Sequence, residues 1–295
     1  MPRQTARRRL ARLDAELVRR GLARSRDQAG ELIQAGLVEV RGVVATKSAT
    51  SVDAETAIRV LAGTDPGYAS RGAHKLVGAL RDFAIDPGGR SCLDAGASNG
   101  GFTDVLLRAG ADSVAAVDVG YGQLAWSLQT DARVRVHDRT NIRTLTPDVI
   151  GGPVSLTVAD LSFISLRLVL PALLACTRPD GDVLPMVKPQ FEVGRDRLGK
   201  GGVVREPELH VESVYAVAVT AAGLGWATCG VTPSRLPGPA GNVEFFLWLR
   251  RRDAPDLGAT LAAIRACVKD SEAQLVRSAP GAIGTGLGGE GVGQT

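Results

Sequence analysis

The chain has 295 residues, of which 44% are hydrophobic and 22% charged, a composition typical of a soluble protein of one or two domains. Its four cysteines form no CxxC or Cys/His cluster, so neither a structural zinc site nor a disulfide framework is expected. No stretch reaches the ~18 apolar residues of a membrane helix, and the N-terminus lacks the apolar segment of a secretory signal. A secreted or membrane-spanning protein is therefore disfavoured, and the free thiols favour the cytoplasm.

Positive charge is concentrated at the N-terminal end. Residues 1–50 contain eleven Arg/Lys and five Asp/Glu, a net charge of +6, whereas the remaining 245 residues carry a net charge of −2. A compact basic module attached to a near-neutral body predicts docking onto a polyanion, because contacts to phosphates supply affinity through counterion release. The alternative is a solvated basic tail. The pattern of elements in this segment favours a folded module.

The N-terminal segment predicts two short helices. Leucines at helical spacing indicate the first, which is expected to stop at Gly21. Ser25, with Gln28 three residues later, is a capping-box pattern for the second helix, which is expected to end at Gly36.

A small sheet is expected next, from valines on both sides of a turn at Gly42 and a strand near residues 56–61. Residues 12–61, beginning "RLDAELVRRGLARSRDQAGELIQAGLVEVRG", resemble the S-four-like RNA-binding domain, in which a helix–turn–helix and a hairpin present basic side chains to RNA. The resemblance implies an α+β RNA-binding domain over residues 1–61, with 1–11 as a basic extension. By resemblance, the RNA-binding side chains of this domain are Arg12, Arg24, Arg26 and Lys47.

The body of the protein predicts an α/β fold. Residues 62–70 contain Gly63, Pro66 and Gly67 and are expected to form a linker. Strand and helix signals then alternate, which predicts a doubly wound, mostly parallel Rossmann-like sheet over residues 71–275. Strands are expected at 91–95, 113–118, 133–137, 154–160 and 182–188, a helix at 206–222, and an antiparallel pair of strands at 226–233 and 243–250. Residues 276–295 are expected to form a disordered, glycine-rich tail.

A glycine-rich loop, "LDAGASNGGFTD", is the first motif with chemical content. It follows a predicted strand, at the edge where open α/β sheets bind ligands, but it is not the G-x-G-x-x-G dinucleotide fingerprint. Asp118 and Asp138 end the next two strands, and each alone could be an ordinary turn residue. As a set, acids at successive strand ends fit S-adenosylmethionine better than a pyrophosphate. The expected cofactor-binding residues are Asp94, Gly96, Ala97, Ser98, Asn99, Gly100, Gly101, Phe102, Asp118, Asp138 and Asp160.

Two lysines and two acids form the second motif. Lys75 opens the body, Asp160 and Lys188 end the fourth and fifth strands, and Glu244 begins the last strand. The carboxyl ends of parallel strands and the beginning of an antiparallel strand share one sheet edge, so these four side chains can meet there. A lone lysine at a strand end is normally a surface charge. Two lysines and two acids beside a cofactor loop indicate catalysis.

Collinear segments that include "SRGAHKLVGAL", "VADLSFISL", "VKPQFEVG" and "GNVEFFLWL" resemble the TlyA family. These are S-adenosylmethionine-dependent 2′-O-ribose methyltransferases of ribosomal RNA, with a body similar to FtsJ-type enzymes. The resemblance covers residues 12–250 and implies Lys75, Asp160, Lys188 and Glu244 as the catalytic tetrad. It also implies cytidines of 16S and 23S rRNA in ribosomal subunits as substrates, and a link to susceptibility to ribosome-targeting cyclic peptide antibiotics. No metal and no membrane partner is expected.

One departure from the family concerns the linker, where actinobacterial members carry Arg-x-Trp-Val and this chain has Pro66-Gly67-Tyr68-Ala69. In the body, Arg71 and Arg139 are expected to hold RNA phosphates near the cofactor edge.

The reaction requires removal of a proton, because a ribose 2′-hydroxyl is a poor nucleophile at neutral pH. Lys188 is the expected base: the neighbouring ammonium of Lys75 disfavours its charged form, and Asp160 and Glu244 hold it in position.

Three other functions compete with this interpretation. A small-molecule methyltransferase would share the cofactor loop but would not need the basic module. A non-catalytic ribosome-assembly factor would keep the module but could lose the tetrad. A haemolysin, suggested by the family's historical name, would require a membrane span or an amphipathic basic helix, which the sequence lacks.

Overall fold

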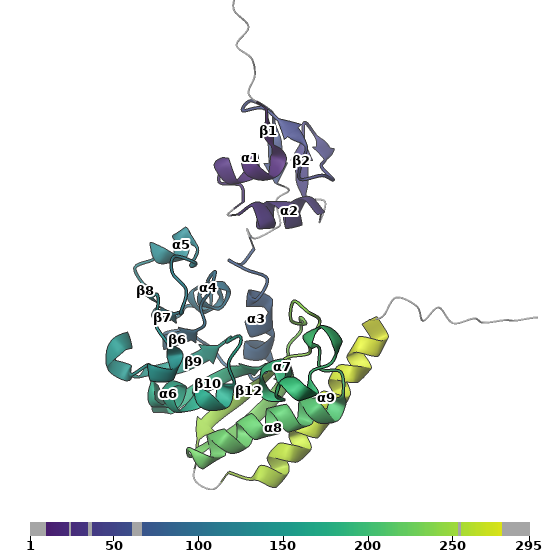
Figure 1. Ribbon diagram of the computed structural model, residues 1–295. Helices are drawn as coiled ribbons and strands as arrows, with labels where there is room; N and C mark the ends of the chain where they lie inside the picture. Colours follow the sequence, from purple (N-terminus) through teal and green to yellow (C-terminus); the bar gives the residue numbers. More distant parts are fainter. Residues whose placement is uncertain (1–9, 24, 35–36, 61–66, 253–254, 279–295) are drawn as a thin grey trace, which may run out of the picture. The chain divides into compact units, whose positions relative to one another are not determined.

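The computed structural model describes residues 10–23, 25–34, 37–60, 67–252 and 255–278 (Figure 1). The chain divides into two compact units, Met1–Ser70 and Arg71–Thr295, and each has its own hydrophobic core. Among the described residues, no helix is both long and apolar enough to cross a membrane.

The first unit is a small α+β domain. Its elements are β1 (Ala11–Arg12), α1 (Leu13–Arg19), α2 (Arg26–Gln34), β2 (Val38–Val40), β3 (Val43–Val44), β4 (Ser51–Val52) and β5 (Ile58–Val60). Strand β2 lies between β3 and β5, and β1 pairs with β4, all antiparallel. The pairing of β1 with β4 was not predicted, because two-residue strands carry no readable alternation. The core of this unit is formed by Leu13, Leu17, Ala23, Ala29, Ile33, Val38, Ala45 and Val52.

Local sequence signals fix the ends of these elements. Gly21 adopts φ +70° immediately after α1, a conformation that favours glycine and stops the helix where the sequence predicted. At the start of α2, the Ser25 hydroxyl accepts a hydrogen bond from the backbone N–H of Gln28 (3.1 Å), as the capping-box pattern predicted. Arg41 and Gly42 both have positive φ, the geometry of a tight hairpin turn between β2 and β3. The predicted helix end at Gly36 lies outside the described residues.

Two buried acids lie beneath the basic surface of this unit. Glu16 accepts hydrogen bonds from Arg19 (2.6 and 2.7 Å) and Arg20 (2.8 Å), and these bonds lower the pKa of Glu16 to about 2. Arg20 also donates to the backbone carbonyls of residues 53, 54 and 56, so it joins α1 to the turn before β5. Asp14 accepts from Arg12 and Arg26, whose hydrogen bonds hold its pKa far below the ordinary value. The acids therefore fix the arginines in place.

Glu16→Gln should destabilise the first unit by about 2 kcal/mol at neutral pH, because charge-assisted hydrogen bonds to two arginines are lost. The folded-state pKa lies below the ordinary value of 4.5, so this contribution is complete above pH 4.5 and is lost as the pH falls toward 2. Thermal unfolding, followed by NMR signals of α1, should show the difference between wild type and variant shrinking from pH 7 to pH 3. Glu39→Gln is the control, since Glu39 has no ion pair in the described part of the chain. Equal effects of the two variants would contradict the assignment.

The second unit is built on a seven-stranded sheet in the order β11-β12-β10-β9-β6-β7-β8. Its strands are β6 (Ser91–Ala95), β7 (Ser113–Val117), β8 (Val134–His137), β9 (Val154–Ala159), β10 (Thr177–Val187), β11 (Trp226–Pro233) and β12 (Phe245–Arg251). Strands β10, β9, β6, β7 and β8 run parallel, and β12 is antiparallel to both of its neighbours. The predicted α/β fold with a mostly parallel, doubly wound sheet is confirmed.

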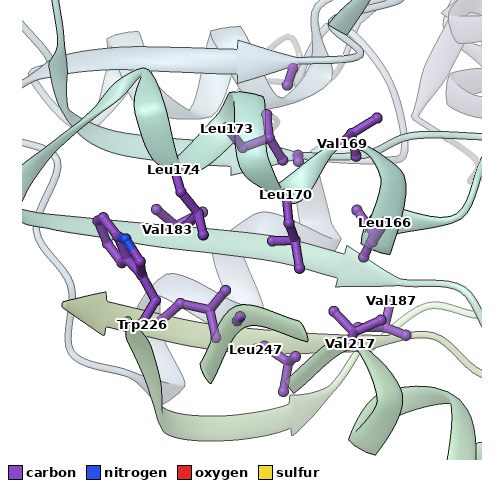
Figure 2. Close-up of a cluster of buried hydrophobic side chains, with 14 of the residues drawn as sticks. Leu166, Val169, Leu170, Leu173, Leu174, Val183, Val187, Val217, Trp226 and Leu247 are labelled. Carbon is purple, nitrogen blue, oxygen red and sulfur yellow. The ribbon is translucent and has the colours of Figure 1, made fainter. Parts of the chain in front are cut away.

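Helices cover this sheet (Figure 1). They are α3 (Ala73–Asp82), α4 (Gly101–Arg108), α5 (Trp126–Gln129), α6 (Leu170–Ala175), α7 (Pro189–Glu192), α8 (Pro207–Gly223) and α9 (Leu257–Ser278). Short 3-10 turns complete the unit, η1 (Ile142–Thr144), η2 (Pro147–Ile150), η3 (Leu166–Leu168), η4 (Arg195–Arg197) and η5 (Lys200–Gly202). Figure 2 shows the core, where leucines of α6 and the preceding turn meet Val183 and Val187 of β10, Val217 of α8 and Leu247 of β12.

Two elements differ from the expectation. Strand β10 begins at Thr177, five residues before the predicted start, with a register shift between Thr177 and Asp182 that the turn residues of this stretch concealed. Helix α9 was not predicted. It packs against α8 and β11 and extends to Ser278, three residues into the segment that we expected to be a tail. The remainder of that tail lies outside the described residues.

Candidate active site

Gly96 brings the ends of β6 and β9 together. It adopts φ +88°, and a Cβ atom at this position would lie 2.4 Å from the backbone oxygen of Asp160. The N–H of Asp160 donates to the carbonyl of Ala95 (3.0 Å), which fixes the two strand ends side by side. Any side chain at position 96 would push Asp160 away from the sheet edge, so the glycine sets the geometry of the site.

A pocket of about 650 Å³ opens at this edge. Asp118 lies in its wall, where its carboxylate accepts hydrogen bonds from the backbone N–H groups of Ser98 (2.8 Å) and Gly120 (2.7 Å). Of the predicted cofactor residues, the pocket is lined by Gly96, Ser98, Asp118 and Asp160. The lining also includes residues that were not predicted, namely Val119, Gln123, Asn141, Ile142, Arg143, Leu161, Ser162, Phe163, Ile164 and Val169.

The other predicted cofactor residues support the loop from behind or lie beside it. They are Asp94, Ala97, Asn99, Gly100, Gly101, Phe102 and Asp138. Asp138 accepts a hydrogen bond from the N–H of Gly122 (2.8 Å) and so holds the loop after β7. Gly101 begins α4, and Phe102 is buried and packs against Phe246. These residues support the glycine-rich loop or lie beside it, but they are not part of the pocket surface.

Asp94 lies in β6, just before the glycine-rich loop, and is completely buried. One carboxylate oxygen accepts from the Thr103 hydroxyl (2.7 Å), and the other has no hydrogen-bond partner among the residues that the structure describes. Burial raises the pKa of Asp94 to about 7, and the negative charges of Asp160 and Asp118 act in the same direction. The carboxylates of Asp118 and Asp160, which line the pocket, favour a cationic ligand there.

The four residues of the predicted tetrad form two ion pairs, each with a buried lysine. Lys188 Nζ lies 2.6 Å from Asp160 Oδ1 and donates to the Ser162 hydroxyl (3.0 Å). Lys75 Nζ donates to Glu244 Oε2 (2.5 Å). Both lysines are 8% exposed, and Glu244 is 1% exposed. We expected Glu244 to hold Lys188, but its contact is with Lys75, and Ser162 takes the second place beside Lys188.

Local structure explains why these lysines are buried. Lys75 lies in the first turn of α3, whose buried face includes Leu76 and Ala79. Lys188 is the cap residue of α7, and Pro189 occupies the first helical position, where its missing N–H costs no hydrogen bond. The chain therefore turns sharply after β10 and leaves the lysine side chain at the sheet edge.

A second pocket of about 610 Å³ adjoins the pairs and is lined by Lys188 and Glu244. Three residues, Ser162, Phe163 and Ile164, line both pockets. The remaining residues of the second pocket are Gln190, Phe191, Gly194, Leu198, Gly202, Pro239, Ala240 and Asn242. A group in one pocket and a group in the other can therefore meet beside Asp160 and Lys188, the arrangement that a group-transfer reaction requires.

Phe163 stands at the boundary of the two pockets. Its side chain is 92% exposed, its φ is +63°, and its ring lies 5.3 Å from that of Phe191. A positive φ is uncommon for a bulky residue and persists only where the surroundings impose it. Phe163 lies within the segment "VADLSFISL" but was not predicted as a site residue. The signal that could have found it is an aromatic residue three positions after a strand-end acid.

The predicted RNA-binding residues lie in both units. In the first unit, Arg12 and Arg26 are about half exposed and both contact Asp14, and Lys47 is exposed. In the second unit, Arg71 and Arg139 are exposed, and the guanidinium of Arg139 lies 4.3 Å from the centre of the Tyr121 ring. Arg24 lies outside the described residues.

No group of three or more His, Cys, Asp or Glu side chains that could hold a metal ion occurs in the part of the chain that the structure describes.

Comparison with known proteins assigns the two units. The FtsJ-like methyltransferase model matches residues 68–251, and the S4 domain model matches residues 11–58. The 16S/23S rRNA (cytidine-2′-O)-methyltransferase TlyA of Mycobacterium tuberculosis is 61% identical over 251 residues, which cover 85% of this chain and 94% of that protein. Hemolysin A of Brachyspira hyodysenteriae is 34% identical, covering 79% of this chain and 97% of that protein.

A solved structure from Streptococcus thermophilus, described as a candidate hemolysin, is similar with a TM-score of 0.70 and 37% identity. The similarity covers 91% of this chain and 98% of that one. These matches and the site define the class of the protein, a methyltransferase with an FtsJ-like catalytic unit and an S4 domain. The chain belongs to the TlyA family of methyltransferases.

Lys75→Met should destabilise the second unit by about 3 kcal/mol, because it leaves the carboxylate of Glu244 buried without its cation. Adding Glu244→Gln should restore most of this loss, since the pair is then removed as a whole. Urea unfolding followed by the fluorescence of Trp226 and Trp248 measures both variants, with exposed Lys269→Met as the control. Additive effects of the two substitutions would mean that the pair is not coupled.

Proposed function

We propose that this protein transfers a methyl group from S-adenosylmethionine to the 2′-hydroxyl of cytidines in 16S and 23S rRNA. The observation that carries the proposal is the position of Lys188, which is held by Asp160 and Ser162 at the junction of two pockets. The related protein of Mycobacterium tuberculosis is named for this activity. The family resemblance of the sequence further implies that loss of the methylation changes susceptibility to ribosome-targeting cyclic peptide antibiotics.

The residues of the first pocket fit S-adenosylmethionine. The Asp118 carboxylate accepts hydrogen bonds from two backbone N–H groups. Its remaining lone pairs can accept hydrogen bonds from the hydroxyls of a ribose. Asp118 and Asp160 place carboxylates in the wall of this pocket, which suits a sulfonium and an ammonium group. Gly96 leaves room for close approach to the backbone. When bound there, this cofactor supplies an activated methyl group.

The second pocket suits a nucleoside. Its volume of about 610 Å³ is within the usual range for small-ligand sites, and aromatic rings occur in its wall. A 2′-hydroxyl within a duplex is hard to align with a methyl donor, so the target nucleotide is expected to leave the stack. The exposed ring of Phe163 offers a face on which an unstacked base can lie.

Lys188 acts on the hydroxyl proton in this proposal. Asp160 and Ser162 orient Nζ, and in its neutral form Nζ can accept the proton of a hydroxyl placed in the second pocket. Glu244 lines this pocket, and one of its carboxylate oxygens is buried without a hydrogen-bond partner among the described residues. The pair of Lys75 with Glu244 keeps this carboxylate in place.

The first unit serves as the docking module for rRNA within ribosomal subunits. Buried Asp14 and Glu16 hold three arginines that are at least half exposed, Arg12, Arg19 and Arg26, which reduces the entropy cost of presenting them to phosphates. Arg139 in the second unit carries its charge on a tyrosine ring at an exposed site, an arrangement that suits both phosphate contact and stacking.

Methylation mapping tests this function. The wild-type protein should add 2′-O-methyl groups to cytidines of 16S and 23S rRNA in subunits that lack them. Lys188→Ala should abolish transfer while S-adenosylmethionine affinity, measured by calorimetry, changes by no more than about threefold, because Lys188 acts on the hydroxyl. Exposed Lys269→Ala should behave as wild type. Near-wild-type turnover of Lys188→Ala would remove this lysine from the base role, and a wild-type protein that methylates no rRNA would refute the function.

Charge reversal should separate docking from catalysis. Lys47→Glu should weaken binding to ribosomal subunits and reduce the slope of log affinity against log salt by about one or more, while the single-turnover rate at saturating protein stays unchanged. Arg71→Glu, four residues before Lys75, should slow turnover more than it weakens binding. Arg265→Glu, on α9, is the matched control. Identical profiles for Lys47→Glu and Arg71→Glu would mean that the two units have no separate roles.

A further inference from the structure

Glu192, at the end of α7, is a buried acid that neither the tetrad nor the cofactor pocket uses. Its side chain is 1% exposed. One carboxylate oxygen accepts from the Ser165 hydroxyl (2.6 Å) and from Arg167 Nε (3.2 Å), and the other accepts from the backbone N–H of Leu166 (2.7 Å). All these donors come from three consecutive residues. The carboxylate is therefore satisfied by one short segment of chain, at the start of η3.

That segment ends the loop that forms the boundary between the two pockets. Residues 160–164 of this loop carry Asp160, Ser162 and Phe163, and each of the three contacts the segment around α7: Asp160 and Ser162 contact Lys188, and Phe163 contacts Phe191. Glu192 adds the last connection, on the far side of Phe163 along the chain. The loop is thus tied to residues 188–192 at three successive places.

These connections are needed because neither α7 nor the loop that contains Phe163 can hold its conformation alone. Helix α7 has four residues, too few to be stable in isolation. Phe163 combines a positive φ with an almost completely exposed ring, so it gains little from packing to offset its backbone strain. Burial of a carboxylate is also costly unless it is fully hydrogen-bonded. A buried glutamate whose carboxylate accepts hydrogen bonds from three consecutive residues, two positions after the strained Phe163, is explained if the position of this loop matters.

We propose that Glu192 is a positioning residue for methyl transfer: it fixes the loop of residues 162–167 so that Ser162 and Phe163 stay at the junction of the two pockets. The expected effect of Glu192 on the reaction rests on the proposed function, whereas its expected effect on the conformation of the loop does not. The direct contact with the substrate is made by the loop, and Glu192 acts through it.

Glu192→Gln is the variant to test, because it keeps the size of the side chain but presents an N–H₂ group to donors. The single-turnover rate of rRNA methylation should fall by about tenfold or more, while the affinity for S-adenosylmethionine changes by less than about threefold. The unfolding temperature of the second unit should fall by no more than about 3 °C. Glu212→Gln is the matched control, since Glu212 is a half-exposed carboxylate on α8 that pairs with Arg197 and does not contact the loop.

A spectroscopic measurement reports the loop without any activity. With 4-fluorophenylalanine incorporated at position 163, the fluorine NMR signal should shift or broaden in Glu192→Gln and stay unchanged in Glu212→Gln. Ser165→Ala should give the same change to a smaller degree, and adding it to Glu192→Gln should have no further effect, because both remove the same hydrogen bond.

The proposal is overturned if Glu192→Gln leaves either the rate or the fluorine signal unchanged. It is also overturned if rate, cofactor affinity and unfolding temperature fall together, since Glu192 would then be only a stabilising residue. If the wild-type protein methylates no rRNA, the proposed function fails, and an unchanged fluorine signal would then be the result that refutes the positioning role as well.

Discussion

Two ion pairs, each between a buried lysine and a carboxylate, link the topology of the sheet to the site. A buried ammonium is tolerated only when it is paired and hydrogen-bonded. The pair of Lys188 with Asp160 requires β9 and β10 to be parallel neighbours, since only then do their carboxyl ends meet. The pair of Lys75 with Glu244 requires β12 to be antiparallel, since its beginning must reach the same edge. The topology of the sheet and the chemistry of the site are therefore one requirement.

The same edge carries a concentration of negative charge that costs stability. The pKa of Asp94 is raised to about 7 by burial and by Asp160 and Asp118, so an ionised Asp94 is unfavourable in the folded protein. The left-handed backbone of Phe163 is a further cost. Natural sequences accept such local costs where a ligand offsets them. In the proposed function, a cationic cofactor lowers the electrostatic part of this cost. The positioning role proposed for Glu192 maintains the strained backbone of Phe163.

The sequence contained enough to predict the sheet and the edge at which the site lies. Runs of apolar residues predicted the strands. Asp118 and Asp160 could be predicted as site residues because they follow strands, and side chains at that position face the ligand edge. Which lysine pairs with which acid was not readable, since the choice depends on side-chain geometry within a few ångströms. Phe163 and Glu192 had no role in the sequence reading for a related reason: an exposed phenylalanine and a buried glutamate both reverse the residue's ordinary preference.

The charged side chains of the two units differ in their exposure to solvent, and in the proposed function this difference separates the roles of the units. The arginines beside Asp14 and Glu16 are mostly exposed, so salt screens their attraction for a polyanion. Lys188, Lys75 and Glu244 are buried and Asp160 is one quarter exposed, so salt screens these two pairs less. In the proposed function, ionic strength therefore acts on the encounter of the first unit with RNA, whereas it affects the arrangement around Lys188 less. A protein built in this way can release its target without disturbing the arrangement that performs the reaction.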